Sequence, residues 1–377
     1  MIAGLDSMIS RKVKLFISGF LILLLVLSSC HSMDSKDKLQ FKKNARLFNA
    51  AHAGRLIEVQ SALREGAEID AKMPNGVTAF WIASQNGHTH VIKFLLNMDA
   101  GINIEVRRPE DGITALWIAS QYGHKEVVKL LLDKEADVEA KRTTDDITTL
   151  WVASQNGHIE VVKLLLGKGA DTEAKRTTDG VTALWMASQQ GHAEVVKLLL
   201  DKEADVEVKS LLTGATGLFM ATQNNHVKVV ELLLNNGAEV NVTDPNNGVT
   251  PLLLASQHGH AGVVKFLLDK GADVEAKRHG DSVTSLWMAS QNGHFEVVKL
   301  LLNSGADVKV KRITEGATPL FIAVQNGHTE VIKLLLDKGA DVNTKVTVNQ
   351  VVWTPIKVAK KMKRTKIVTI LVKAGAK

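Results

Sequence analysis

The chain has 377 residues, of which 45% are hydrophobic and 23% are charged, and this composition excludes disorder throughout. The 46 lysines and arginines against 40 acids give a net charge of +6, which at first favours a nucleic-acid partner. The one cysteine, Cys30, excludes an intramolecular disulfide and a cysteine-built zinc or iron–sulfur site.

The first thirty residues are typical of a targeting segment. Basic residues precede an apolar run at 15–26, which is too short for a comfortable membrane span. Residues 27–30, Leu-Ser-Ser-Cys, resemble the lipobox of bacterial lipoproteins. The resemblance implies that residues 1–29 are a signal peptide, that Cys30 carries a lipid, and that the protein is anchored in the cell envelope. His31 favours the outer membrane or the periplasmic face. A single-pass, uncleaved signal anchor is the alternative.

Charge is distributed unevenly over the rest of the chain. Residues 30–45 are expected to be a tether between the membrane and the folded part. Residues 47–348 hold 30 basic and 37 acidic side chains, whereas residues 349–377 hold eight basic side chains and no acid. Affinity for nucleic acid rises with the number of phosphates neutralised. The acidic body of the protein therefore argues against a nucleic-acid partner.

Internal repetition dominates the sequence. Eight threonines start similar apolar runs at intervals of 34 residues, after one interval of 36: Thr78, Thr114, Thr148, Thr182, Thr216, Thr250, Thr284 and Thr318. Eight histidines of Gly-His or Asn-His pairs keep the same intervals: His88, His124, His158, His192, His226, His260, His294 and His328. These landmarks predict eight full repeats within residues 46–348. A degenerate unit starts the array, and a basic unit at 349–377 closes it.

Each repeat predicts two short antiparallel helices. In the repeat that begins at Thr182, a threonine N-cap precedes apolar residues at helical spacing, and Gly191 ends the first helix. His192 opens the second helix. Helices this short are marginal in water, so each repeat must stack on its neighbours. The residues that remain lead back to the next threonine as a hairpin-like arm. The predicted fold is an all-α solenoid with β-hairpin-like arms.

The repeats resemble ankyrin repeats, through recurring Thr-x-Leu, Gly-His, Val-Val, triple-leucine and Gly-Ala-Asp elements over nearly all of residues 47–377. The sequence departs from the family where tryptophan replaces the histidine of the threonine-led tetrad, as in Trp151 and Trp185. We expect these tryptophans to stack between repeats. We expect the histidines before the second helices to cap those helices rather than to bind metal.

The resemblance implies a binding surface at the arm tips and at the ends of the first helices. A polar, uncharged stripe lies there, made of Gln85, Gln121, Gln155, Gln189, Gln223, Gln257, Gln291 and Gln325. Glutamine both donates and accepts, so the stripe could bond an extended backbone or a sugar chain, although glutamine is also a common exposed helix former. Tyr122, His258, Leu211 and Leu212 break the repeat pattern and are the better candidates for strong contacts.

The sequence carries no catalytic motif, and the repeats use the whole chain after the targeting segment, so we expect no enzyme activity, cofactor or metal. The favoured function is a membrane-anchored scaffold, expected to be monomeric, that mediates protein–protein interaction. The alternatives are a host-directed surface or secreted interaction module, and a glycan or peptidoglycan binder.

Overall fold

The computed structural model describes residues 34–98 and 102–377, which belong to two compact units, residues 1–144 and 145–377. The first unit contains α2 (Ser35–Ala53), α3 (Leu56–Arg64), α4 (Ala79–Gln85), α5 (Thr89–Asn97), α6 (Ala115–Tyr122) and α7 (Lys125–Asp133). Cys30 and the predicted signal peptide lie outside the described residues.

The second unit continues the alternation of first and second helices. Its first helices are α8 (Thr149–Gln155), α10 (Ala183–Gln190), α12 (Gly217–Gln223), α14 (Pro251–His258), α16 (Ser285–Asn292), α18 (Pro319–Asn326) and α20 (Pro355–Lys361). Its second helices are α9 (Ile159–Gly167), α11 (Ala193–Leu200), α13 (Val227–Asn235), α15 (Ala261–Asp269), α17 (Phe295–Asn303), α19 (Thr329–Asp337) and α21 (Thr365–Lys373).

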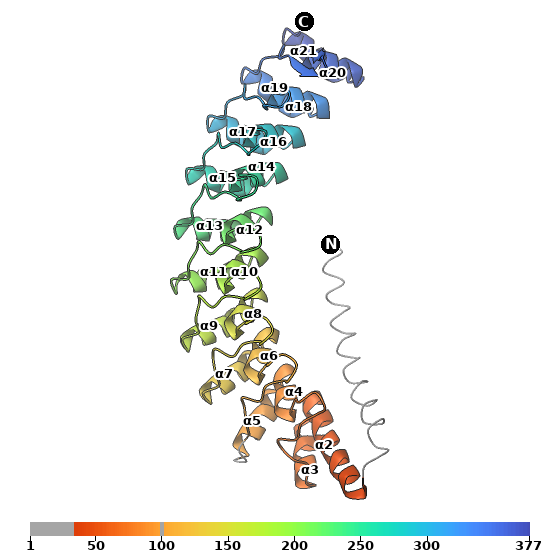
Figure 1. The fold of residues 1–377 in the computed structure, drawn as a ribbon, viewed down its shortest axis with the longest axis vertical. Helices are drawn as coiled ribbons and strands as arrows, with labels where there is room; N and C mark the ends of the chain where they lie inside the picture. Colours follow the sequence, from red (N-terminus) through yellow and green to blue (C-terminus); the bar gives the residue numbers. More distant parts are fainter. Residues whose placement is uncertain (1–33, 99–101) are drawn as a thin grey trace. The chain divides into compact units, whose positions relative to one another are not determined.

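Within each unit the helices form two layers. First helices pack on the first helices of adjacent repeats, as α4 does on α2 and α6, and α16 does on α14 and α18. Second helices form the other layer, as in the row from α9 to α19 (Figure 1). The described residues thus contain the eight predicted helix pairs, with α2 and α3 before them and α20 and α21 after them. This repeated pairing is an all-α solenoid.

The segment expected to be a tether is partly helical. Residues 35–45 form the first turns of α2, which begins after Asp34, whose carboxylate accepts hydrogen bonds from the N–H groups of Lys36 and Asp37. Gln40 donates to the carbonyl of Gly66 at 3.0 Å. The Gln40 bond attaches the segment to the starting repeat, so a tether can only be proposed for the residues before the helix.

The threonines cap the first helices as predicted. In all eight full repeats the threonine side chain accepts from the N–H group three residues later, as Thr182 does from Trp185 at 3.4 Å. Such a cap satisfies one of the otherwise unpaired N–H groups at the start of a helix, and its loss typically costs about 1 kcal/mol. Thr354, at the start of the closing repeat, makes no such bond.

The core lies between the two helix layers of each repeat and between adjacent repeats. On a second helix such as α9, Val161, Val162 and Leu165 are at most 1% exposed. First helices are buried along most of their length, because they face both neighbouring repeats and their own partner helix. In α10, the six residues from Ala183 to Ser188 are all buried.

The arms that join repeats are mostly turns. One extended hairpin occurs in the described residues, where β1 (Val346–Val348) pairs antiparallel with β2 (Val351–Trp353). Adjacent arms are linked by single backbone bonds, such as Leu211 N–H to the carbonyl of Asp179 at 2.8 Å and Ile313 N–H to that of Asp281 at 3.1 Å. The arms are therefore hairpin-like turns, one of which has an antiparallel bridge between Lys209 and Thr216, and a two-stranded hairpin forms in the closing repeat.

The closing repeat covers the last full repeat of the second unit. Its helix α20 packs on α18, and it buries Ile356, Val358, Ile367 and Leu371, each at most 7% exposed. In the outer layer of the last full repeat, Val331, Ile332 and Leu335 are at most 1% exposed.

We predict that a chain ending at Val348 will aggregate. Without α20 and α21, the apolar side chains of α18 and α19 that face the closing repeat become exposed to water, and terminal repeats keep solenoids soluble. The measurement is size-exclusion chromatography with light scattering, and a chain that ends at Ala374 is the control. A chain ending at Val348 that stays soluble, with an unfolding midpoint equal to that of the parent, would contradict this role.

Candidate interaction surface

The glutamine stripe keeps its side chains at the surface. None of the eight glutamines is buried, and Gln223, Gln257 and Gln325 are exposed. Each is within the last turn of its first helix, so the side chains project from the edge of the first-helix layer. The glutamine side chains are therefore at least partly exposed in each unit, and their binding of a partner stays a prediction.

The backbone carbonyls of the same glutamines hold the histidines of the following repeat. His226 Nε2 lies 3.1 Å from the carbonyl oxygen of Gln189, and His328 Nε2 lies 2.9 Å from that of Gln291. A carbonyl can only accept, so Nε2 carries the proton. These histidines occupy the N-cap position, but their side chains make no capping bond. The expectation that they cap the second helix is wrong, because each ring reaches the preceding repeat instead.

Glycine makes room for each histidine. Gly191 has φ +81°, and a Cβ at this residue would lie 2.5 Å from ring atoms of His226. Asn225 occupies the equivalent position one repeat later with φ 60°. The His260 ring that follows has a lowered pKa, because burial disfavours its charge and because His258 and His294 are near. The recurrent Gly-His pair is therefore a joint between repeats.

The tryptophans are structural, as predicted. Trp81, Trp117, Trp151, Trp185 and Trp287 are between 1% and 7% exposed. Where the bond is resolved, the indole Nε1 donates to the carbonyl just before the next repeat's threonine, as Trp185 does to Ala215 at 2.8 Å. The same carbonyl accepts from the arm, through Ser210 N–H at 3.0 Å. These five rings offer no open face on which a sugar or a base could stack.

An arginine of the next arm covers most of these tryptophans. The guanidinium carbon of Arg176 lies 4.9 Å from the ring centroid of Trp151, and Arg312 lies 5.4 Å from that of Trp287. Cation–π contacts of this kind contribute about 0.5–2 kcal/mol each. Arg176 also donates through Nε to Asp179 at 2.8 Å. This bond, opposed by burial, lowers the pKa of the Asp179 carboxyl. The arginines of the arms are thus held in place, while lysines beside them, such as Lys175 and Lys277, are exposed.

The four residues that break the pattern lie at three separate places along the chain. Tyr122 is 36% exposed at the end of α6, with its ring stacked on His124 at a centroid distance of 6.1 Å. His258 is exposed at the end of α14 and stacks on His260 at 5.6 Å. Leu211 and Leu212 are 79% and 75% exposed at an arm tip. Within the second unit, Leu211 and Leu212 are at an arm tip and His258 is at the end of a first helix, and Leu211 also lies against the turn at Gly180.

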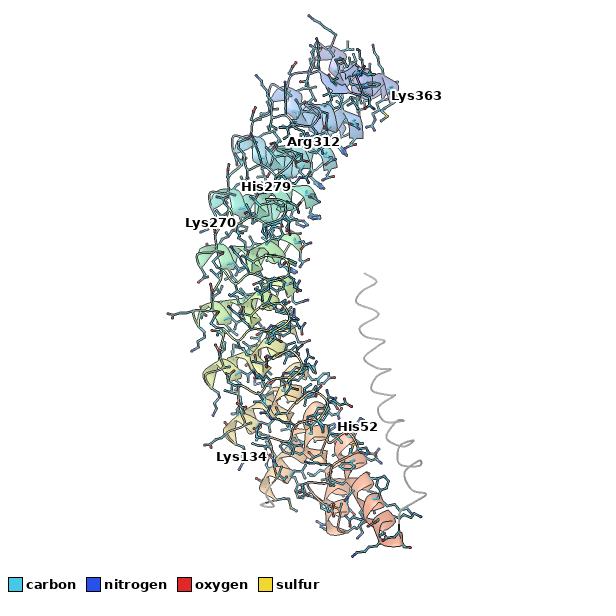
Figure 2. The ribbon with its side chains drawn as sticks, in the orientation of Figure 1. His52, Lys134, Lys270, His279, Arg312 and Lys363 are labelled. Atoms are coloured by element: carbon cyan, nitrogen blue, oxygen red, sulfur yellow. The ribbon has the colours of Figure 1, made fainter. Side chains whose placement is uncertain are left out.

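The structure contains two features that the sequence pattern did not predict: acids that link repeats, and pockets. Acids after the second helices link adjacent repeats, as Glu173 does by accepting from Asp205 N–H at 2.9 Å and Glu275 by accepting from Asp307 N–H at 2.8 Å. Their recurrence at 34-residue intervals was the available signal. The second feature is a pair of pockets in the second unit, one of which involves Arg312 (Figure 2) together with Trp287 and Gln291. The other lies at the closing repeat.

The described residues contain no group of three histidine, cysteine or acidic side chains placed to hold a metal ion. In the same part of the chain, no helix is both long and apolar enough to cross a membrane.

The family assignment agrees with this geometry. A family model described as ankyrin repeats (3 copies) matches residues 47–142, 139–210, 208–278 and 286–377. The chain therefore belongs to the ankyrin repeat family, whose members generally mediate protein–protein interaction and are typically non-catalytic scaffolds. A search of curated protein sequences finds no match to the chain.

We predict that Gly191→Ala destabilises the protein more than Gly271→Ala. Both glycines have φ above +80°, so alanine costs about 1–2 kcal/mol at either position. No heavy atom lies within 4 Å of a Cβ built at Gly271, whereas the His226 ring blocks one at Gly191. Displacing that ring breaks its bond to Gln189, which adds about 1 kcal/mol. Urea unfolding midpoints measure the difference, and equal midpoints would show that the histidine joint contributes nothing.

Proposed function

We propose that the chain is a lipid-anchored scaffold of the cell envelope that binds a protein partner through the ends of its first helices and its arms. The proposal rests on one observation: recurring and non-recurring side chains make different contacts. The recurring tryptophans, histidines and arm arginines join repeats and the recurring threonines cap the first helices, so the exposed residues that do not recur are left to recognise a partner. Distinctive contacts require distinctive residues.

The anchoring half of the proposal rests on the sequence. The lipobox-like residues 27–30 place the one cysteine where lipidation requires it. The described part of the chain begins close behind, with α2 fastened to the starting repeat. The few residues between Cys30 and α2 would hold the repeats close to the membrane surface. The outer membrane or periplasmic face is the proposed location.

The Cys30→Ser variant tests the anchor. We expect it to lose labelling by a fatty-acid analogue and to leave the membrane fraction, because the thiol is the only group that the lipobox-like motif offers for acylation. Thermal unfolding of the variant should match that of the parent, since the change lies outside the helix pairs. Continued labelling of the variant would rule out this anchor.

Partner recognition is tested after affinity capture from envelope extracts with the wild-type chain as bait. Tyr122→Ala and Leu211→Ala should weaken binding of the captured partner, each by about 2 kcal/mol if the residue is a hot spot. Unfolding midpoints should change little, because Leu211 is 79% exposed and Tyr122 is at the surface at the end of α6. The control is Lys163→Ala on α9, which removes an exposed ion pair to Glu160 and should alter neither property.

The glycan alternative gives a different result in the same experiment. A repetitive ligand would use the recurring glutamines, so single changes at Tyr122 or Leu211 would leave its binding unaltered. Equal binding by the two variants and the parent would therefore overturn recognition by distinctive residues.

A further inference from the structure

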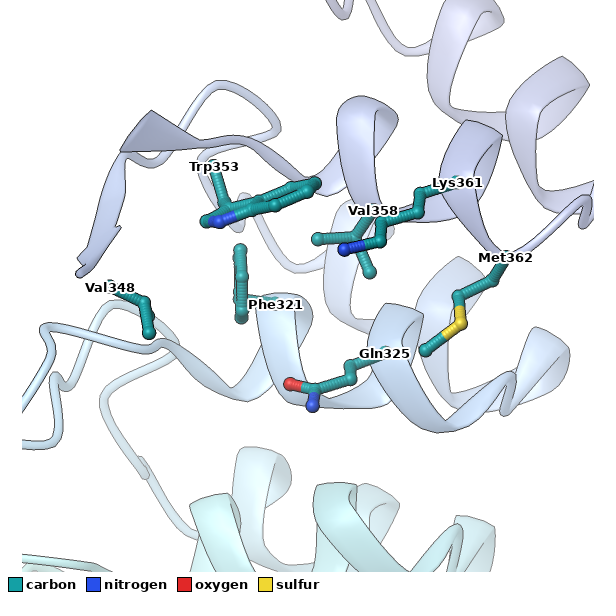
Figure 3. Close-up of a pocket in the computed structure, with 7 residues that line it drawn as sticks. All are labelled: Phe321, Gln325, Val348, Trp353, Val358, Lys361 and Met362. Atoms are coloured by element: carbon teal, nitrogen blue, oxygen red, sulfur yellow. The ribbon is translucent and has the colours of Figure 1, made fainter. Parts of the chain in front are cut away.

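A pocket of about 240 Å³ opens between the last full repeat and the closing repeat, inside the second unit. Phe321 of α18, Trp353 of β2 and Val358 of α20 line it, with Val348, Lys361 and Met362 around them. Figure 3 shows the Phe321 ring below that of Trp353, with its edge toward the indole, and with Val348 on one side and Met362 on the other. Its walls are therefore mostly apolar.

The pocket exists because the closing arm departs from the other arms. In four arms an arginine six residues before the threonine covers the ring of the preceding first helix. Such an arginine also pairs with an acid three residues later, as Arg312 does with Glu315. In the closing arm these two positions are Val348 and Val351, which pair across the β1–β2 hairpin. Two valines thus replace the arginine and its paired acid, so the Phe321 ring has no arginine above it.

Apolar side chains gather at this end of the second unit. Val348, Val351 and Val352 of the hairpin are 44%, 51% and 42% exposed, and Met362 is 50% exposed. Val358, which forms the floor between them, is 7% exposed. A recess with an apolar floor and an exposed apolar rim is the form expected for a contact site rather than for a solvated edge.

The charged side chain in the pocket lining is a lysine, Lys361, and it belongs to the basic end of the chain. Residues 349–377 contribute eight basic side chains and no acid, whereas residues 47–348 have more acids than bases. The Nζ atom of Lys361 lies 4.5 Å from the ring centroid of Trp353, and that of Lys357 lies 3.3 Å from the carbonyl oxygen of Val352. No carboxylate lines the pocket to neutralise these lysines. An occupant that satisfies both features is apolar at one point and acidic on either side of it.

We propose that this closing pocket docks an acidic, extended segment of a partner protein that inserts one large apolar side chain between Trp353 and Phe321. The lysines of α20 then face the acids that flank the inserted side chain, which gives complementary charge at the rim. A recess of this size holds one projecting side chain, whereas a flat lipid surface cannot fill it. The inference rests on the proposed role in protein interaction and names the chemistry of one partner segment.

The test uses the full-length chain in detergent micelles and a fluorescein-labelled peptide of alternating Asp and Glu residues with one central Phe. Fluorescence anisotropy should show binding that weakens with added salt, because exposed charges are screened. Two comparison peptides separate the features: one has Gly in place of Phe, and the other has Asn and Gln in place of the acids. Both should bind at least about tenfold more weakly, since each lacks half of the complementary surface.

Variants of the chain locate the binding. Lys361→Glu and Met362→Glu change exposed side chains at the rim, so the fold is kept, and each should weaken binding of the acidic peptide about tenfold or more. Lys299→Glu is the matched control, because it makes the same charge change at an exposed position on α17 and lies outside the pocket. It should bind the peptide as the parent does.

Three results would overturn the proposal. The first is binding of all three peptides with equal affinity, and the second is equal loss in Lys361→Glu and Lys299→Glu. The third is absence of peptide binding together with Lys361-dependent binding to phosphatidylglycerol vesicles over phosphatidylcholine vesicles, which would make this end a membrane-facing surface. None of these results bears on Cys30 labelling or on Tyr122, so failure here is distinguishable from failure of the scaffold role.

Discussion

Stacking of neighbouring repeats is the constraint on which the rest of this structure depends. The helices of the full repeats are seven to nine residues long, too short to persist alone in water. Each gains its stability from the helix pairs on either side within its unit. The burial of whole first helices, such as α10, follows from this need, because a first helix contacts two neighbouring repeats and its own partner. Most recurring side chains are therefore committed to joints.

Three kinds of side-chain hydrogen bond join adjacent repeats: two use a backbone carbonyl and the third uses a carboxylate. The indole of Trp185 reaches the carbonyl of Ala215, which precedes the next threonine, and the imidazole of His226 reaches back to the carbonyl of Gln189. In the third kind, the carboxylate of Glu173 accepts a hydrogen bond from the N–H group of Asp205. Buried polar groups must find partners, so these bonds fix the register between repeats as well as their distance.

The use of recurring side chains in these joints explains where binding residues can be found. A side chain that serves a joint in every repeat cannot also distinguish one partner from another. The exceptions are the positions where a joint has been altered. Ser210 stands where other arms have arginine, next to the exposed Leu211 and Leu212, and Val348 stands at the same position of the closing arm, next to an open pocket. At both places the arginine is absent and apolar side chains are exposed.

The sequence by itself determined the repeat number, the helix pairs and the threonine caps, because a 34-residue period and local capping chemistry depend only on residues close together in the chain. It also indicated the burial of the tryptophans and the exposure of the glutamines. Only the tertiary structure decided which carbonyl His226 bonds and which ring Arg176 covers, since these partners lie in the preceding repeat. It also showed that residues 35–45 are helical, and that Trp353 and Phe321 enclose a pocket. A contact between repeats depends on how neighbouring repeats pack against each other, and a local sequence pattern does not specify that packing.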